Sequence, residues 1–500
     1  MKKYRPWNPD QSYLLPPSPR EWLPEGHLVY FILDVVAALD LEAITRAVQA
    51  KDARGERPYS PAMMLALLMY GYCVGVFSSR RIGMATYEDV AFRVLAAGEH
   101  PHFTRIAAFR RDHLAAFKGL FLQGLKLCQK AGLVKLGQVA LDGTKVEANA
   151  SKHKAMSYDR MQKEETRLKG EIEALLARAQ STDAVEDAKF GEGQSEQDVP
   201  AELARREVRL ARIQTAKREL EQEALHSRMA TLTEQAAGDR QTAQNHPEEQ
   251  RRHAATTNAA KKDRQREELA AKLDDDDIET PRGGAPTSDG LPTHRVAATP
   301  EAKPAAKAQR NFTDPDSRVM ERGGSFLQGF NCQLAVDGHA QVIVAEAVTN
   351  QSPDNGNFVP MLAQAKVNCG QAPATACADT GYWQPEAESQ ARLLGTEAFI
   401  ATGRERANED AAPQIVSVAN ADDDARLRMK NKLSSPAGKA IYRRRKAIVE
   451  PVNGQIKEAR GFRRFHLRGW KGVRGEWSLV CACHNLLKLF QVGMPHTCPI

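Results

Sequence analysis

The sequence lacks the features that mark disulfide-bonded, secreted or membrane proteins. It has eight cysteines in 500 residues, and they are scattered without paired spacing. No run reaches the roughly 18 apolar residues that a membrane span requires. The polar, proline-rich stretch after Met1 is unlike a signal peptide. These absences argue against a disulfide scaffold and a membrane protein, so we expect a cytoplasmic protein. A chain of 500 residues is too long for one core, and two to four domains are therefore expected.

Two local clusters resemble metal sites but have simpler interpretations. Cys481-Ala-Cys483-His484 lies within an apolar run, and it lacks the second pair of ligands that would close a zinc site. We predict buried structural thiols there. The aspartate run 274–277 stands beside a tract rich in Pro, Gly and Thr. Consecutive acids in such a tract are typical of solvated charge in a linker.

Positive charge is concentrated near the end of the chain. The formal net charge is only +7, yet residues 439–474 hold twelve Lys or Arg and two acids, Glu450 and Glu458. Cations around Glu450 hold its carboxylate ionised, so that it can accept a metal ion or a proton. A surface this basic suits a phosphate backbone. We therefore predict that Glu450 is one ligand of an acidic metal site and that the surrounding cations hold DNA.

Two further acids follow short apolar segments. Val139–Leu141 is predicted to be a strand that ends at Asp142, and residues 375–378 form a similar strand before Asp379. Each acid is followed by a glycine within two residues. An acid at the end of a buried strand is well placed to bind a metal. Taken alone, each is more typical of an ordinary turn residue than of a metal ligand.

The first quarter of the chain is predicted to be helical. Residues 1–25 are interpreted as an irregular arm, and residues 26–132 as a helical domain. Thr104 can cap a short helix that carries Arg110 and Arg111. A short basic helix after another short helix is typical of a helix-turn-helix that reads DNA. An ordinary helical bundle with a solvated basic face is the alternative.

The middle of the chain has a different composition. Met161, Leu168 and Leu175 keep a seven-residue spacing, and a similar seam follows at 203–220. We predict an antiparallel helical hairpin at 151–231, joined through the polar stretch 181–199. Apolar content then falls, and residues 232–310 are interpreted as a low-complexity linker that is partly disordered.

Strand patterns return after this insertion. Residues 329–336 and 341–348 are predicted to form a hairpin. A helix is expected at 358–367 and a last strand at 398–401. Strand, hairpin, helix, strand with acid and helix with acid is the order of a ribonuclease-H-like α/β fold. We assign 133–150 and 311–490 to that domain, with the helical insertion after its first strand.

The motifs around the three acids resemble those of bacterial insertion-sequence transposases of the DDE class. The similar segments are Leu141-Asp-Gly-Thr-Lys145, Asp379-Thr-Gly-Tyr-Trp383 and residues 442–457, which resemble the Tyr-Arg-Glu-Lys signature of one branch. The helical region near 15–115 is similar to the family's DNA-binding region. One departure concerns spacing, since four residues separate Arg445 from Glu450 where the family has three. Either Arg445 or Lys446 can therefore take the arginine role.

The resemblance implies two-metal chemistry on DNA. Two Mg²⁺ ions about 4 Å apart, with Mn²⁺ as a substitute, activate the attacking oxygen and stabilise the leaving oxygen. Asp142 would bridge the ions, and Asp379 and Glu450 would each bind one. Water first frees a 3′-hydroxyl at the element's end, and that hydroxyl then attacks target DNA. Pro451, directly after Glu450, is expected to start or kink a helix.

Further expectations concern DNA and assembly. Phosphate contacts are expected from basic and aromatic residues of the signature and its surroundings, and Trp383 is a candidate for base stacking, with packing as the alternative. The expected partners are double-stranded element ends and target DNA, bound by a homodimer or larger assembly associated with the nucleoid and not with a membrane. The rival functions are a catalytically silent DNA-binding regulator and a metal-dependent nuclease on the same fold. The predicted DNA contacts are Tyr442, Arg445, Lys446, Lys457, Arg463, Arg464, Arg110 and Arg111.

Overall fold

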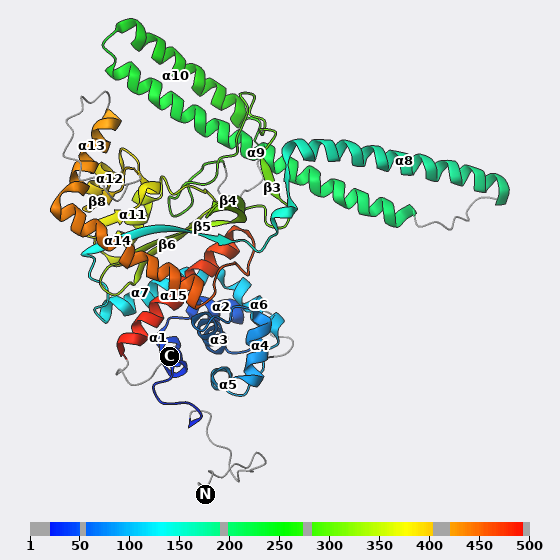
Figure 1. Ribbon diagram of the computed structural model, residues 1–500. Helices are drawn as coiled ribbons and strands as arrows, with labels where there is room; N and C mark the ends of the chain where they lie inside the picture. Colours follow the sequence, from blue (N-terminus) through cyan, green and yellow to red (C-terminus); the bar gives the residue numbers. More distant parts are fainter. Residues whose placement is uncertain (1–20, 51–56, 191–198, 274–282, 404–420, 494–500) are drawn as a thin grey trace, which may run out of the picture. The chain divides into compact units, whose positions relative to one another are not determined.

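The described part of the chain divides into two compact units. The computed structural model describes residues 21–50, 57–190, 199–273, 283–403 and 421–493. Most of the predicted arm, the aspartate run 274–277 and Cys498 lie outside these ranges. The first unit comprises Met1–Leu133, Ile456–Phe462 and Ser478–Ile500, and the second comprises Val134–Gln455 and Arg463–Trp477. Figure 1 shows their elements.

The first unit is helical throughout its described residues. Its centre is α3, where ten residues from Met64 to Cys73 are buried. Pro61 opens this helix, because the proline ring fixes a helical φ and a first-turn residue needs no N–H donor. None of the helices described is long and apolar enough to cross a membrane. The bounds are α1 (Leu28–Ala38), α2 (Glu42–Gln49), α3 (Pro61–Cys73), α4 (Ser79–Glu88), α5 (Val90–Ala96), α6 (Phe103–Asp112), α7 (Leu114–Lys130) and the part of α15 (Gly469–Gly493) from residue 478 onward.

Two predictions for this unit are corrected. His102, not Thr104, caps α6, because its ring nitrogen accepts the backbone N–H of Thr104. Arg110 is only 5 % exposed. Its guanidinium donates to the Tyr72 hydroxyl and the Phe77 carbonyl, each at 2.9 Å. Arg110 therefore joins α6 to α3 inside the bundle, and in this position it cannot contact DNA.

The second unit is built on a mixed sheet. Its strands lie in the order β6-β5-β1-β7-β8, and β4 pairs with the first part of β5. β1, β7 and β8 are parallel, whereas β5 runs antiparallel to β1. The predicted hairpin and short strands are present with small shifts at their ends. The bounds are β1 (Gln138–Glu147), β4 (Arg318–Arg322), β5 (Ser325–Asp337), β6 (Ile343–Thr349), α11 (Phe358–Cys369), β7 (Thr375–Ala378), α12 (Ala387–Leu394), β8 (Glu397–Ile400), α13 (Ala421–Ser434) and α14 (Pro436–Gly454).

The first strand does not end at Asp142 as predicted. β1 continues to Glu147 and pairs with β5 along its length, with Asp142 opposite Leu334. Gly143 is therefore a strand residue and not part of a turn. A Cβ atom at this position would lie 2.0 Å from Asp354 Oδ1 and 2.6 Å from Gln333 Nε2. Glycine is required here by the close approach of those two side chains.

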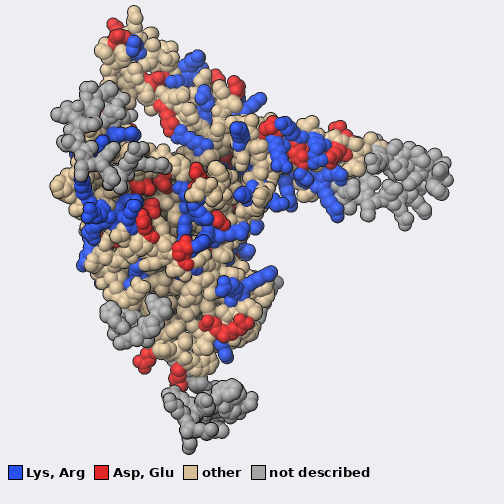
Figure 2. Space-filling view, viewed as in Figure 1, with Lys and Arg blue, Asp and Glu red and all other residues tan. Residues whose placement is uncertain are grey.

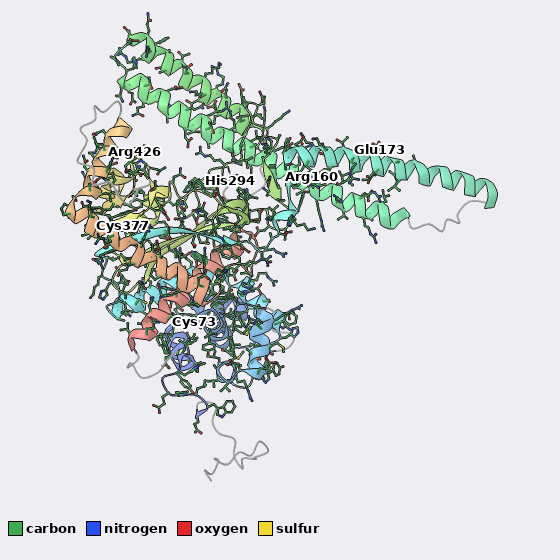
Figure 3. The ribbon with its side chains drawn as sticks, in the orientation of Figure 1. Cys73, Arg160, Glu173, His294, Cys377 and Arg426 are labelled. Atoms are coloured by element: carbon green, nitrogen blue, oxygen red, sulfur yellow. The ribbon has the colours of Figure 1, made fainter. Side chains whose placement is uncertain are left out.

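The helical hairpin of the insertion agrees with the seam in the sequence. α8 (Tyr158–Phe190) lies antiparallel to the first part of α9 (Val199–Asn245). Met161 and Leu168 pack against Ile213 and Ala216 in its core. Figure 3 labels Arg160 and Glu173 along α8. Figure 2 shows both signs of charge interleaved along the visible face of the insertion, as in the pair of Lys217 Nζ with Glu165 Oε2 at 2.9 Å.

The interpretation of 232–310 as a linker is wrong for its first half. α9 continues to Asn245 and packs against α10 (Glu249–Ala270) as a second hairpin. The seam is made of alanines, including the buried Ala236, Ala255 and Ala259. Small side chains let two helices approach closely without large apolar residues, and the sequence pattern therefore understated this helix pair.

Pro451 lies within α14 and does not begin a new helix. Proline has no N–H, so the carbonyl four residues earlier loses its helical partner. That carbonyl belongs to Ala447, and it accepts a hydrogen bond from Gln341 Nε2 at 3.0 Å. The helix changes only after Gly454, where a π-helical turn spans Gln455–Ala459. An uninterrupted α-helical period therefore does not extend from Glu450 to Lys457.

Candidate active site

The parallel register of β1 and β7 brings two of the predicted acids to one place. Val139 pairs with Ala376 and Ala140 with Cys377. The same register leads to Asp142 and Asp379, where the two strands diverge. The carboxyl ends of parallel strands in such sheets commonly carry binding sites. Figure 3 labels Cys377, which marks this part of β7.

The Asp379 side chain shapes the turn that follows β7. Its Oδ1 accepts the backbone N–H of Gly381 at 2.9 Å and caps the short 3₁₀ turn Thr380–Tyr382. Tyr382 is fully buried, and its hydroxyl donates to Gln333 Oε1 on β5. Burial raises the pKa of Tyr382 well above its usual value, and the acids Asp354, Asp142 and Asp379 act in the same direction. The phenol therefore stays protonated.

Helix α14 supplies two polar groups to the same place. Asn453 Nδ2 donates to Asp142 Oδ2 at 2.7 Å. Arg445 is 8 % exposed, and its positive charge lowers the pKa of Asp142. The helix is fastened to the strand by Gln138, whose Nε2 donates to the carbonyl of Ile441 at 2.7 Å.

Negative charge is crowded around Asp142. The pKa of this carboxyl is raised to about 7, and burial is the largest cause. The charges of Asp379 and Asp354 contribute to the rise, and that of Arg445 opposes it. Asp354 was not identified in the sequence, where it lies in an apparently ordinary polar loop. A strongly perturbed acid that has specific charged neighbours indicates a functional site.

Glu450 is placed differently from the two aspartates. It lies on α14, three residues before Asn453, but its side chain is exposed. It is not among the charges that shift the pKa of Asp142. Within the described ranges, no group of three His, Cys, Asp or Glu side chains is arranged to hold a metal ion. The structure thus brings Asp142 and Asp379 together, and Glu450 does not complete a set of three carboxylates.

The donor atoms at this edge nevertheless fit a hard divalent cation. Such cations prefer carboxylate and amide oxygens. Asp142 and Asp379 supply carboxylates. Asn453 Oδ1 is buried and has no hydrogen-bond partner in the described part of the chain. An unsatisfied amide oxygen beside a carboxylate of raised pKa is suited to a cation, which would neutralise the crowded charge.

The other predicted contacts lie in varied surroundings. Trp383 and Tyr442 are half-buried against Cys377 and Phe399, which agrees with a packing role. Lys446 is exposed, unlike Arg445. Arg464 Nε donates to the carbonyl of Ala148 just after β1, at 3.2 Å. The remaining contacts are exposed, as in Arg111 and Arg463, or half-buried, as in Lys457. Cys481 and Cys483 are free, buried thiols, as predicted.

These features define a mixed α/β protein with an acidic site at the edge of its sheet. Residues 402–490 match the family model of a transposase DDE domain, and residues 17–112 match that of a transposase domain (DUF772). Both family models describe transposases, and the two matches support a transposase with a DDE domain, a class whose processes are transposition and DNA recombination. Enzymes of this kind generally cleave DNA and use divalent metal ions. Searches of curated proteins and of solved structures gave no match.

Proposed function

We propose that this protein is an insertion-sequence transposase of the Tyr-Arg-Glu-Lys branch, with a ribonuclease-H-like catalytic domain. It binds the terminal inverted repeats of its element and cleaves phosphodiesters at the element ends. It then joins the freed 3′-hydroxyl to target DNA. The observation that carries this proposal is the parallel register that leads β1 and β7 to Asp142 and Asp379.

The residues of the site have separate roles in this proposal. Asp142 and Asp379 hold Mg²⁺, or Mn²⁺ in its place, and Glu450 is the third acid. Two bound divalent ions would neutralise the scissile phosphate and activate the attacking oxygen. Asn453 orients the Asp142 carboxylate through the bond to Oδ2. Arg445 balances the acids when the site is empty and attracts a phosphate oxygen when DNA is bound.

DNA is held by groups outside the acids. Exposed cations such as Lys446, Arg463 and Arg464 contact phosphates, and the helical first unit binds the terminal repeats. Synapsis of two element ends requires a dimer or larger assembly. The interleaved charges of the insertion in Figure 2 favour pairing between helices over binding of a polyanion. The α8–α9 hairpin is therefore the candidate dimer contact.

The test is cleavage of DNA that carries the ends flanking the protein's own gene. The purified protein with Mg²⁺ is expected to cut at the element ends, and EDTA is expected to abolish cutting. Asp379→Asn should abolish cleavage and leave gel-shift binding nearly intact. Asp289→Asn is a matched control, because Asp289 is similarly shielded but pairs with Arg474 away from the site.

The alternative functions correspond to distinct outcomes of this experiment. End-specific binding without cleavage by the wild-type protein would indicate a silent regulator. Cleavage without preference for the element ends would indicate a nuclease. Full cleavage by Asp379→Asn would overturn the site assignment.

A further inference from the structure

Besides the three acids of the proposed site, a fourth acid, Asp354, lies beside β1 and β5 next to that site. We propose that Asp354 is a positioning residue, which holds the Asp379 turn against β1 through Gln333 and Tyr382. Its role in the reaction rests on the proposed function. Its role in fixing the turn rests on contacts alone, and the two can be tested apart.

The Asp354 carboxylate lies close to two glycines, Gly143 and Gly381. A Cβ on Gly143 would lie 2.0 Å from Asp354 Oδ1, and a Cβ on Gly381 would lie 3.4 Å from Asp354 Oδ2. The same Gly381 Cβ would be 3.1 Å from Asp379 Oδ1. The carboxylate thus occupies space beside β1 and beside the Asp379 turn, which side chains at 143 and 381 would otherwise fill.

Three side chains hold the carboxylate in this seat. Asp354 Oδ1 accepts Asn331 Nδ2 at 2.8 Å and Gln333 Nε2 at 2.7 Å. Both donors lie on β5 and are fully buried. Asp354 Oδ2 lies 3.7 Å from Lys145 Nζ on β1. Hydrogen bonds from buried amides to a charged acceptor are strong and directional, so they fix the orientation of the group.

Gln333 transmits this orientation to the Asp379 turn. Its amide nitrogen is committed to Asp354, which fixes the direction of its carbonyl oxygen. That oxygen accepts the hydroxyl of Tyr382, the last residue of the turn capped by Asp379. The Gln333 amide nitrogen thus has this partner only when Asp354 is present as an acceptor, and the amide oxygen then faces the Tyr382 hydroxyl.

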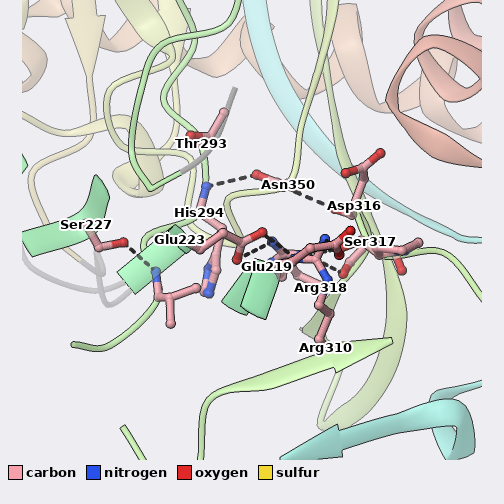
Figure 4. A network of polar contacts seen from close by, with 12 residues as sticks. Glu219, Glu223, Ser227, Thr293, His294, Arg310, Asp316, Ser317, Arg318 and Asn350 are labelled. Carbon is pink, nitrogen blue, oxygen red and sulfur yellow. Dashed lines mark hydrogen bonds and ion pairs between the residues drawn. The ribbon is translucent and has the colours of Figure 1, made fainter. Parts of the chain in front are cut away.

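The loop that carries Asp354 is itself fixed at its start. Asn350 Oδ1 accepts the backbone N–H of His294 at 2.9 Å, and Asn350 Nδ2 donates to the carbonyl of Asp316 at 3.1 Å. Figure 4 shows these two bonds on either side of Asn350. The Asp354 carbonyl accepts the N–H of Asn357 at 3.2 Å and leads the chain into α11. The seat is therefore rigid at both ends.

Three variants separate the parts of this arrangement. Asp354→Ala removes the acceptor. Asp354→Asn keeps an oxygen that can accept from Asn331 and Gln333 but removes the charge. Tyr382→Phe breaks only the last bond of the chain. Asp289→Asn is the control, since the Asp289 side chain is 15 % exposed and that of Asp354 is 14 % exposed, and each pairs with a cation.

Hydrogen exchange of the full-length, metal-free protein tests the positioning. Asp354→Ala is expected to speed exchange of the Gly381 amide at least tenfold. Asp354→Asn and Tyr382→Phe are expected to give smaller increases, and Asp289→Asn none. Single-turnover cleavage of element-end DNA should fall at least tenfold in Asp354→Ala, with the Kd for DNA unchanged and partial recovery in Asp354→Asn.

The outcomes separate this inference from the proposed function. Unchanged exchange at Gly381 in both Asp354 variants would overturn the positioning role, whether or not the protein cleaves DNA. Faster exchange with wild-type cleavage rates would overturn its role in the reaction alone. Should Asp354→Ala fail to fold, Asp354→Asn and Tyr382→Phe decide the result. Cleavage by Asp142→Asn would instead refute the proposed function and leave the exchange result standing.

Discussion

Two polar clusters in the second unit differ in their charge balance. At the edge of the sheet, Asp142, Asp379 and Asp354 crowd together, and the pKa of Asp142 rises to about 7 because of burial and its acidic neighbours. At the base of the insertion, Glu223 lies between two arginines (Figure 4). Arg310 Nη1 is 2.6 Å from its Oε1, and Arg318 Nη2 is 2.9 Å from the same oxygen.

The second cluster is saturated with respect to charge, because each charged group has an oppositely charged partner within it. Glu223 is 2 % exposed and accepts bonds on both carboxylate oxygens. Arg310 also pairs with Glu219, so two acids face two cations. The cluster fastens α9 to β4 and to the short strand β3 (Gln309–Asn311). Its charges are balanced internally, which is typical of a structural ion network.

The comparison indicates why only one of these clusters is a candidate for chemistry. Buried charge costs free energy unless it is paired. The Glu223 cluster meets that requirement internally. The acidic site, where three acids crowd together, does not. Buried atoms without a hydrogen-bond partner among the described residues occur in both clusters, as in Asn453 Oδ1 and Arg318 Nε, so charge balance is what distinguishes them. A fold that maintains such an imbalance is expected to be completed by a cation from outside.

The largest effect is expected from breaking the saturated cluster. Glu223→Ala leaves Arg310 and Arg318 buried without their shared partner. Removing one member of a buried ion pair typically costs about 3–5 kcal/mol. Chemical denaturation should show this loss, whereas Glu171→Gln on the exposed face of the insertion should cost under about 1 kcal/mol. Equal effects of the two variants would contradict the distinction.

A smaller effect is expected from a substitution that fills the space occupied by the Asp354 carboxylate. Gly143→Ala places a methyl group where Asp354 Oδ1 and Gln333 Nε2 now lie, at a cost of about 1–3 kcal/mol for overpacking. Gly238→Ala, in the middle of α9 with open space around it, should instead stabilise by about 1 kcal/mol. Destabilisation by Gly143→Ala should shrink when it is combined with Asp354→Ala. Strict additivity in denaturation experiments would argue against the contact.

The two clusters should also respond to pH in opposite directions. Without metal, folded Asp142 keeps its proton up to about pH 7, whereas the unfolded carboxyl releases it near pH 3.8. Stability therefore falls as the pH rises through that window, by about 4 kcal/mol at most. Asp142→Asn should remove this fall. Denaturation curves between pH 4 and 7, in EDTA, provide the measurement.

His294, beside the saturated cluster, should show the reverse trend. Its pKa is lowered to about 4, chiefly by burial and also by the charge of Arg318, whereas the charge of Glu223 opposes this shift. In the unfolded state the imidazole of His294 binds a proton below about pH 6.5, whereas in the folded state it stays neutral down to about pH 4. Stability then rises between pH 4 and 6.5, by about 3 kcal/mol at most. His294→Gln should flatten this rise, and a steeper rise in the variant would contradict the assignment.

The smallest effect concerns a single phosphate contact. Arg463→Ala should weaken DNA binding and lower the log–log salt slope by about 0.9. Arg428→Ala is the control, because Arg428 pairs with Asp424 on α13. Binding titrations at several salt concentrations measure the slope, and an unchanged slope for Arg463→Ala would remove this residue from the interface.

Much of the sheet could be predicted from the sequence, because its strands are short apolar runs separated by polar turns. The β5–β6 hairpin and β7 follow from alternation and from turn residues. The extent of β1 could not be predicted, since Asp142-Gly143 is a common turn pair. Only the tertiary contact with Asp354 explains why glycine stands in a strand there.

The site was predicted in part. Asp142 and Asp379 follow from their place after apolar strands. Asp354 and Asn453 could not be predicted as site residues from the sequence. Their contacts depend on the register of the strands and on which face of α14 packs against β1. The prediction for Arg110 was also wrong. Its place on a short basic helix indicated a DNA contact, but its hydrogen bonds to Tyr72 and Phe77 hold it inside the bundle.

Iron-directed cleavage of the polypeptide tests the central claim most directly. Fe²⁺ substitutes for the divalent ion, and with ascorbate and peroxide it cuts backbone near its ligands. Cuts are expected beside Asp142 and Asp379, and they should be suppressed by Mg²⁺ and abolished by Asp142→Asn. A third cut beside Glu450 would place that acid at the ion. Cuts confined to other parts of the chain, or unchanged in Asp142→Asn, would contradict a metal site at this edge of the sheet.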